Sequence, residues 1–148
     1  MSSKLFDLTG KVAIVTGAGR GIGKSIAIGL AQHGVDIVLC SRSQKELEQV
    51  AQEVRKLGQK AFPMSVDMTK ISQFDGLVKE TIKAFKHIDI LVNNAGALLV
   101  APALEVDEKS WDLVMDTNAK GAFFLCQRVG QVMIQQGKGG SIINVTSE

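Results

Sequence analysis

A glycine-rich segment near the amino terminus has residue types and a spacing that suit phosphate binding. Residues Thr16 to Gly23 read TGAGRGIG, follow an apolar run and open a helical pattern without a side-chain N-cap. Uncapped helical amides need another acceptor, and a pyrophosphate supplies oxygens and negative charge to them. Gly17 permits the tight turn, Gly21 admits the phosphates, and Gly23 lets the helix close on the sheet. A loop that binds nothing is the plainer alternative, but its strand–turn–helix setting favours a nucleotide.

The end of the second apolar run indicates which nucleotide. Folds that bind NAD usually place a carboxylate there to hold the ribose 2′-hydroxyl. Here the residues are Cys40, Ser41 and Arg42. The Arg42 fork and the Ser41 hydroxyl suit a 2′-phosphate, and Arg20 in the glycine turn is placed to close over it. The alternative is that both arginines are merely solvated. We therefore predict NADP(H), with NAD(H) as the weaker expectation.

Alternating strands and helices must position these residues. Short apolar runs and longer segments of helical period alternate along the chain, which predicts an α/β fold with a doubly wound parallel sheet of the Rossmann type. Strands this apolar are expected to be buried on both faces, with ligands at their carboxyl ends. The expected strands are 11–16, 36–40, 60–66, 88–92 and 141–146, and the four expected helices are 22–33, 44–57, 71–85 and 108–136.

Local signals mark the ends of these helices. Ser43 and Glu46 form a capping-box pattern, in which each side chain accepts a hydrogen bond from the backbone amide of the other residue. Gly34, Gly58 and Gly137 follow helical stretches, where a left-handed residue is favoured.

Composition limits the classes of function. The chain has 148 residues, 45% of them apolar and 22% charged, with a net charge of +2. We expect one ordinary domain over 1–148, neither disordered nor binding nucleic acid through bulk charge. The sequence shows no membrane span, signal peptide or metal-site spacing, and Cys40 and Cys126 are expected to be buried free thiols. A cytoplasmic protein is the expectation.

Five motifs occur in the order and at the strand ends found in one family. They are TGAGRGIG at 16–23, Asp67 after the third strand, NNAG at 93–96, Asn118 within MDTN at 115–118, and SIINVTS at 141–147. Together they cover the whole chain, which resembles the short-chain dehydrogenase/reductase family.

The resemblance implies hydride transfer between a nicotinamide and a carbonyl or alcohol carbon. Ser147 would hydrogen-bond the substrate oxygen, and Asn118 would hold a water of the proton relay and fix a distortion of its helix. The family's YxxxK tyrosine and lysine follow the serine, but this sequence contains no tyrosine and stops at Glu148. The cofactor residues implied are Gly17, Arg20, Gly21, Ile22, Gly23, Ser41, Arg42, Asp67, Met68, Asn94, Ala95 and Gly96.

The missing motif predicts that the chain is the amino-terminal part of such an enzyme and is inactive by itself. The fifth strand would then be an open apolar edge. The long helix would lose the neighbouring helix that it packs beside, which would partly expose Trp111, Phe123 and Phe124. The complete protein would be a homo-oligomer, by resemblance a tetramer.

Two other functions compete with an oxidoreductase. A nucleotide-binding module without redox activity would keep the whole glycine turn. A methyltransferase would need an acidic residue at the end of the second strand, which Ser41 and Arg42 argue against. Substrate identity stays open between 3-oxoacyl thioesters and sugars or polyols, since Leu98, Leu99 and Val100 would supply one apolar wall at most.

Overall fold

The computed structural model describes residues 4–147 and contains one sheet of five parallel strands. The strands are β1 (Val12–Thr16), β2 (Asp36–Ser41), β3 (Ala61–Ser65), β4 (Ile90–Asn93) and β5 (Ser141–Asn144). Their order in the sheet is β3-β2-β1-β4-β5. The order reverses beside β1, which is the switch point of a doubly wound sheet, so the predicted fold class is confirmed. Residues 1–3, which entered the expectation of no signal peptide, and Glu148 lie outside the described residues.

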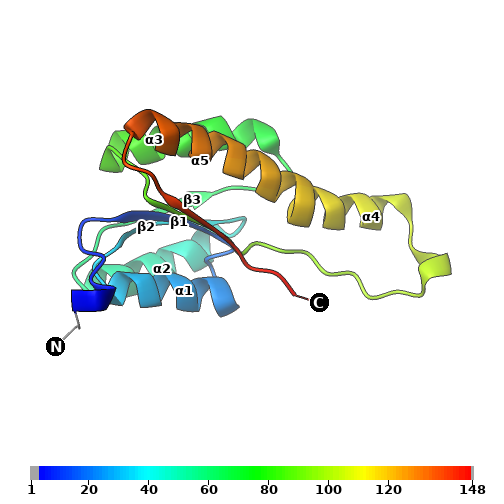
Figure 1. Ribbon diagram of the computed structural model, residues 1–148. Coiled ribbons are helices and arrows are strands. Elements are labelled where there is room, and N and C mark those ends of the chain that lie inside the picture. Colours follow the sequence, from blue (N-terminus) through cyan, green and yellow to red (C-terminus); the bar gives the residue numbers. More distant parts are fainter. Residues whose placement is uncertain (1–3, 148) are drawn as a thin grey trace.

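Helices cover both faces of the sheet (Figure 1). The α-helices are α1 (Gly21–Gln32), α2 (Gln44–Lys56), α3 (Phe74–Phe85), α4 (Glu108–Met115) and α5 (Ala122–Gln136). One face carries α1 and α2, whose Ala27, Leu47 and Val50 are buried in the same cluster as Val15 of β1. The other face carries α3 and α5, whose Leu77, Leu125 and Met133 pack in a second cluster. Two apolar layers therefore hold the sheet rigid between the helices.

The last predicted helix is not continuous. Residues Asp116–Gly121 form a π-helical turn between α4 and α5, so the expected helix 108–136 is divided in two. Figure 1 shows α4 extending past the sheet beyond the end of α5, beside the loop that leads from β4. The π-helical turn contains Asn118, where the resemblance implied a distorted helix.

Burial on both faces holds for the central strands and fails at the edges. All five residues of β1 are buried, whereas β3 is half-buried or exposed and all four residues of β5 are exposed. Both exposed strands lie at a sheet edge, where fewer side chains surround them. The expected exposure on the long helical segment is also found, since Trp111 and Phe123 are 59% and 63% exposed and Phe124 is half-buried.

The helix-end signals are confirmed with one exception. Gly34, Gly58 and Gly137 all have positive φ. Ser43 Oγ accepts from the Glu46 amide at 3.3 Å, as predicted. The reciprocal bond of the capping box is absent, because the Ser43 amide donates to Ser41 Oγ at 3.3 Å instead. The Glu46 carboxylate is therefore not used as a cap.

No helix within residues 4–147 has the length and apolar character needed to cross a bilayer.

Candidate functional site

A cleft of about 960 Å³ opens where β1, β2 and β4 end. All twelve residues predicted to contact a cofactor line it, from Gly17 in the glycine turn to Gly96 after β4. Its volume lies at the upper end of the range for ligand sites. The cleft is also lined by residues outside the predicted cofactor set, among them Leu98, which was predicted to supply an apolar wall; these residues are Gly19, Ser43, Glu46, Val66, Ala97, Leu98, Leu113 and Thr117.

The glycine turn brings the start of α1 to the cleft. Gly17 and Gly21 have φ of 66° and 55°, a left-handed region that other residues adopt at a cost. Arg20 occupies the N-cap position with extended backbone and makes no side-chain cap, as predicted. The first amides of α1 therefore have no side-chain cap and present the positive end of the helix dipole to the cleft.

Gly23 permits a close approach of α1 to the residues that directly follow β1 and β4. A Cβ at this position would overlap the Gly17 carbonyl and the side-chain nitrogen of Asn94. The close approach is thus between α1, its own turn and the loop after β4, at the carboxyl ends of these two strands. The absence of a side chain at Gly23 keeps these three segments together.

The loop after β4 is fastened to the end of β1. Thr16 Oγ1 accepts from the amides of Asn94 and Ala95, both at 3.0 Å. The Asn94 side chain donates to the Thr16 carbonyl at 3.0 Å. Thr16 itself is fully buried. These bonds hold the two loops that form the cleft in a fixed relation, before any ligand is present.

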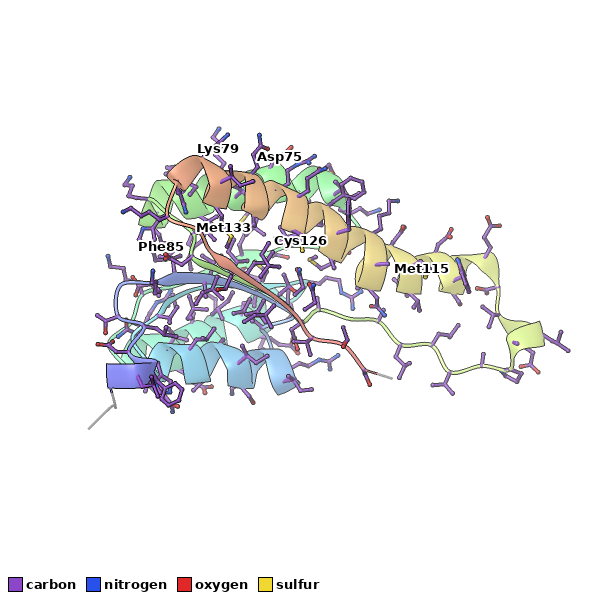
Figure 2. All side chains as sticks on the ribbon, viewed as in Figure 1. Asp75, Lys79, Phe85, Met115, Cys126 and Met133 are labelled. Carbon is purple, nitrogen blue, oxygen red and sulfur yellow. The ribbon has the colours of Figure 1, made fainter. Side chains whose placement is uncertain are left out.

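Asn93 ties β4 to its neighbours behind the cleft. Its Nδ2 donates to Cys126 Sγ of α5 at 3.0 Å and to Asn144 Oδ1 of β5 at 2.9 Å. Figure 2 shows Cys126 on the side of α5 that faces the sheet. Cys126 is half-buried rather than buried as expected, whereas Cys40 is buried and burial raises the pKa of its thiol to about 12. Neither cysteine lines the cleft.

Two cations stand at the β2 end of the cleft. The Arg20 and Arg42 side chains are exposed, and neither forms an ion pair within residues 4–147. Ser41, which directly precedes Arg42 in the sequence, also lines the cleft. Unpaired guanidiniums in a cleft are suited to bind a phosphate group.

Asp67 lines the cleft from the loop after β3. Its Oδ1 accepts from the amide and the hydroxyl of Thr69, each at 2.9 Å. The hydrogen bond from the Thr69 amide is the largest cause that lowers the pKa of Asp67, and the nearby Arg42 adds to it. The backbone amide of Asp67 donates to Gln73 Oε1 at 2.8 Å, which fixes the loop. Asp67 is therefore a rigid, ionised acceptor.

The two predicted catalytic residues lie outside the lining of the cleft. Asn118 holds the loop after β4, because its Oδ1 accepts from the Ala97 amide at 2.7 Å and its Nδ2 donates to the Ala97 carbonyl at 2.8 Å. Ala97 does line the cleft, so Asn118 supports its wall. Ser147 is an exposed residue that follows β5.

The residues of the cleft fit a phosphorylated dinucleotide. The start of α1 offers amides without side-chain caps, the two arginines offer cations, and the volume accommodates a large ligand. Within residues 4–147 no group of three or more His, Cys, Asp or Glu side chains is gathered in one place.

Part of what the sequence reasoning missed could have been found. Glu46 follows the end of β2 by five residues and belongs to the first turn of α2, so its position near the cleft could have been predicted from the sequence. Leu113 and Thr117 lie far along the sequence on α4 and the π-helical turn. They reach the cleft only because that segment projects past the sheet (Figure 1).

Comparison with known proteins gives one consistent result. A family model described as short chain dehydrogenase matches residues 11–148. The 2-dehydro-3-deoxy-D-gluconate 5-dehydrogenase of Escherichia coli is 44% identical over 96% of this chain and 55% of its own length. A hydroxynaphthalene reductase-like protein of Metarhizium robertsii is 39% identical over 95% of this chain and 52% of its own. The chain thus spans about half the length of these curated relatives.

Solved structures agree with this result. A short-chain type dehydrogenase/reductase from Mycobacterium marinum superposes with a TM-score of 0.93 at 37% identity, over 97% of this chain and 58% of that one. A metagenomic short-chain oxidoreductase in complex with NADP gives a TM-score of 0.91 at 33% identity, over 96% of this chain and 64% of that one.

Proposed function

The chain belongs to the short-chain dehydrogenase/reductase family, and from that premise we propose that its cleft binds NADP(H). We propose further that the whole protein is an oxidoreductase acting on a carbonyl or alcohol. The observation that carries the proposal is the start of α1, which opens without a side-chain cap into the cleft that Arg20 and Arg42 also line.

Different residues of the cleft would bind different parts of the cofactor. The amides at the start of α1 and the backbone at Gly21 and Ile22 would bind the pyrophosphate. Arg20, Ser41 and Arg42 would bind the 2′-phosphate. Asp67 and Met68 would contact the adenine end of the cofactor, and the backbone from Asn94 to Gly96 would line the path toward the nicotinamide. When bound, NADP(H) supplies or accepts the hydride.

Ser147 and Asn118 would serve the chemical step in the whole protein. The Ser147 hydroxyl would donate a hydrogen bond to the substrate oxygen and stabilise the charge that develops on it. Asn118 would hold a water, while its two bonds to Ala97 keep the loop after β4 in position. The general acid or base of the family is a tyrosine, and this sequence contains none. We therefore propose that the 148-residue chain by itself does not catalyse the reaction.

Two substrate classes fit the proposal. The names of the Escherichia coli and Dickeya dadantii relatives favour a sugar acid or polyol. The exposed apolar side chains of Leu98, Leu99 and Val100, of which Leu98 lines the cleft, favour the acyl chain of a 3-oxoacyl thioester. A panel holding both classes of ketone separates them by rate.

Cofactor binding is tested by fluorescence titration of NADPH and NADH. The 148-residue chain and the protein expressed from the complete gene are compared with the variants Arg20→Gln and Arg42→Gln. Each variant should weaken NADPH binding about tenfold or more and change NADH binding much less. The control is Lys45→Gln, which removes one positive charge from an exposed position of α2 outside the cleft. An equal loss in Arg42→Gln and Lys45→Gln would contradict the 2′-phosphate assignment.

A nucleotide-binding module without redox activity is the second candidate. The observation in its favour is that all predicted cofactor residues line the cleft while Asn118 and Ser147 do not. Turnover of NADPH with the ketone panel separates the candidates. If the protein from the complete gene binds NADPH and reduces no ketone, it is a nucleotide-binding module without redox activity, and the catalytic roles proposed for Ser147 and Asn118 are wrong.

A further inference from the structure

β2 ends without a carboxylate of its own. A carboxylate from the helix that follows, α2, lines the cleft at that end instead. Glu46, in the first turn of α2, lines the cleft together with Ser41 and Arg42. A Cβ built on Gly19 would lie 3.0 Å from Glu46 Oε2 and 3.1 Å from Ser41 Oγ. The carboxylate and the hydroxyl therefore approach the same point beside the glycine turn.

Among residues 4–147 no side chain or backbone group bonds to the Glu46 carboxylate. The Ser43 amide, which a capping box would pair with it, donates to Ser41 Oγ instead. Within residues 4–147 Glu46 forms no ion pair, although Glu48, two residues further along α2, lies 3.7 Å from Arg55. Arg20 and Arg42 are likewise unpaired. The cleft thus holds the Glu46 and Asp67 carboxylates together with the two guanidiniums, and within residues 4–147 none of these four side chains forms an ion pair.

These charges act in opposite directions on the two forms of the cofactor. A carboxylate accepts a hydrogen bond from the ribose 2′-hydroxyl of NAD(H) and repels the 2′-phosphate of NADP(H). Guanidiniums attract the phosphate and gain little from a hydroxyl. Resting on the proposed function, we propose that Glu46 is a cofactor-specificity residue that takes the place of the missing strand-end carboxylate, so that the site accepts NAD(H) as well as NADP(H).

The test removes the charge and keeps the shape. In protein from the complete gene, Glu46→Gln should tighten NADPH binding and weaken NADH binding, raising the ratio of Kd for NADH to Kd for NADPH about tenfold. Glu48→Gln is the matched control, because it removes one carboxylate from the same helix outside the cleft. The control should leave the ratio unchanged. The tighter NADPH binding of Glu46→Gln should shrink at high salt, since screening weakens the repulsion in the parent.

Each outcome decides one claim. If Glu46→Gln and Glu48→Gln show the same ratio as the parent protein, the inference is wrong while the proposed function stands. If the parent protein binds neither nucleotide, the proposed function fails and the inference fails with it. Glu46→Lys is a second test, because reversing the charge should raise the ratio of Kd for NADH to Kd for NADPH further than Glu46→Gln does. Circular dichroism of every variant verifies that it is folded.

Discussion

At the scale of single residues, Thr16 fixes the relation between the two loops of the cleft. Replacing Thr16 with Val keeps the shape and removes the acceptor of the Asn94 and Ala95 amides. We expect a loss of about 2 kcal/mol in the free energy of unfolding, because the two amides lose their partner in a partly buried place. Urea unfolding measures it.

Thr16→Ser is the control for this prediction. Serine keeps the hydroxyl and loses one methyl group, so it should cost only about 1 kcal/mol and should leave NADPH binding intact. Equal losses in Thr16→Val and Thr16→Ser would show that packing, rather than the hydrogen bonds to the loop after β4, is what Thr16 contributes.

Asp67 gives a prediction about pH. Hydrogen bonds from Thr69, with a smaller contribution from Arg42, hold its folded pKa below the ordinary value of 3.8. Between those two values the unfolded chain binds more protons, so this part of the stability falls as the pH falls. It is complete above pH 3.8 and is lost as the pH passes down through the folded value.

The Asp67→Asn variant isolates that contribution. The difference in Tm between the parent protein and Asp67→Asn should be largest near neutral pH and should shrink as the pH falls below 3.8. Thermal melts across this range measure it. A difference that stays constant down to the lowest pH would mean that the ionised carboxylate does not stabilise the loop.

At the scale of elements, the π-helical turn depends on a close backbone contact. A Cβ at Gly121 would overlap the carbonyl of Met68, in the loop after β3. Backbone atoms cannot move aside as a flexible side chain can, so Gly121→Ala should lower the free energy of unfolding by about 3 kcal/mol. It should also weaken nucleotide binding, since Met68 lines the cleft.

Gly130 provides the matched control on the neighbouring helix. It lies within α5 and a Cβ there would have open space, so Gly130→Ala should stabilise the chain by roughly 0.5–1 kcal/mol through helix propensity. Urea unfolding of both variants measures the contrast. A Gly121→Ala variant as stable as Gly130→Ala would show that the contact with Met68 is easily relaxed.

At the scale of the whole molecule, the described chain has an exposed apolar edge. Within residues 4–147, β5 pairs only with β4, and Ile142, Ile143 and Val145 beside that edge are 39%, 48% and 40% exposed. Phe123 of α5 adds further apolar surface. Unpaired edges of this kind template association with another chain.

We therefore expect the 148-residue chain by itself to associate as its concentration rises. Ile143→Lys should reduce the association, because a charge on the edge opposes strand pairing between chains. Size-exclusion chromatography with light scattering measures both proteins over the same range of concentration. Lys138→Ala, in the exposed turn before β5, serves as the control. A parent chain that stays monomeric at every concentration would refute this expectation.

The sequence by itself determined the features that depend on neighbours in the chain. Apolar runs, helical periods and glycine positions predicted the doubly wound fold, and the residues at the strand ends predicted the lining of the cleft. Parallel strands share one carboxyl edge, so residues such as Gly17, Ser41 and Asn94 are brought together by topology alone. Their chemical roles stay predictions.

Only the tertiary structure decided the features that depend on packing between distant segments. The π-helical turn brings Gly121 against the Met68 carbonyl, a contact between distant segments that no local pattern contains, although the resemblance implied a distortion at Asn118. The exposure of β5 follows from its place at the sheet edge rather than from its apolar sequence. The freedom of the Glu46 carboxylate, in contrast, follows from a competition between near neighbours in the chain, because Ser41 Oγ accepts from the Ser43 amide that the capping-box pattern assigned to Glu46. The period of the apolar residues predicts which faces of an element are apolar. The hydrogen-bond partner of a polar group is decided only when the elements pack together.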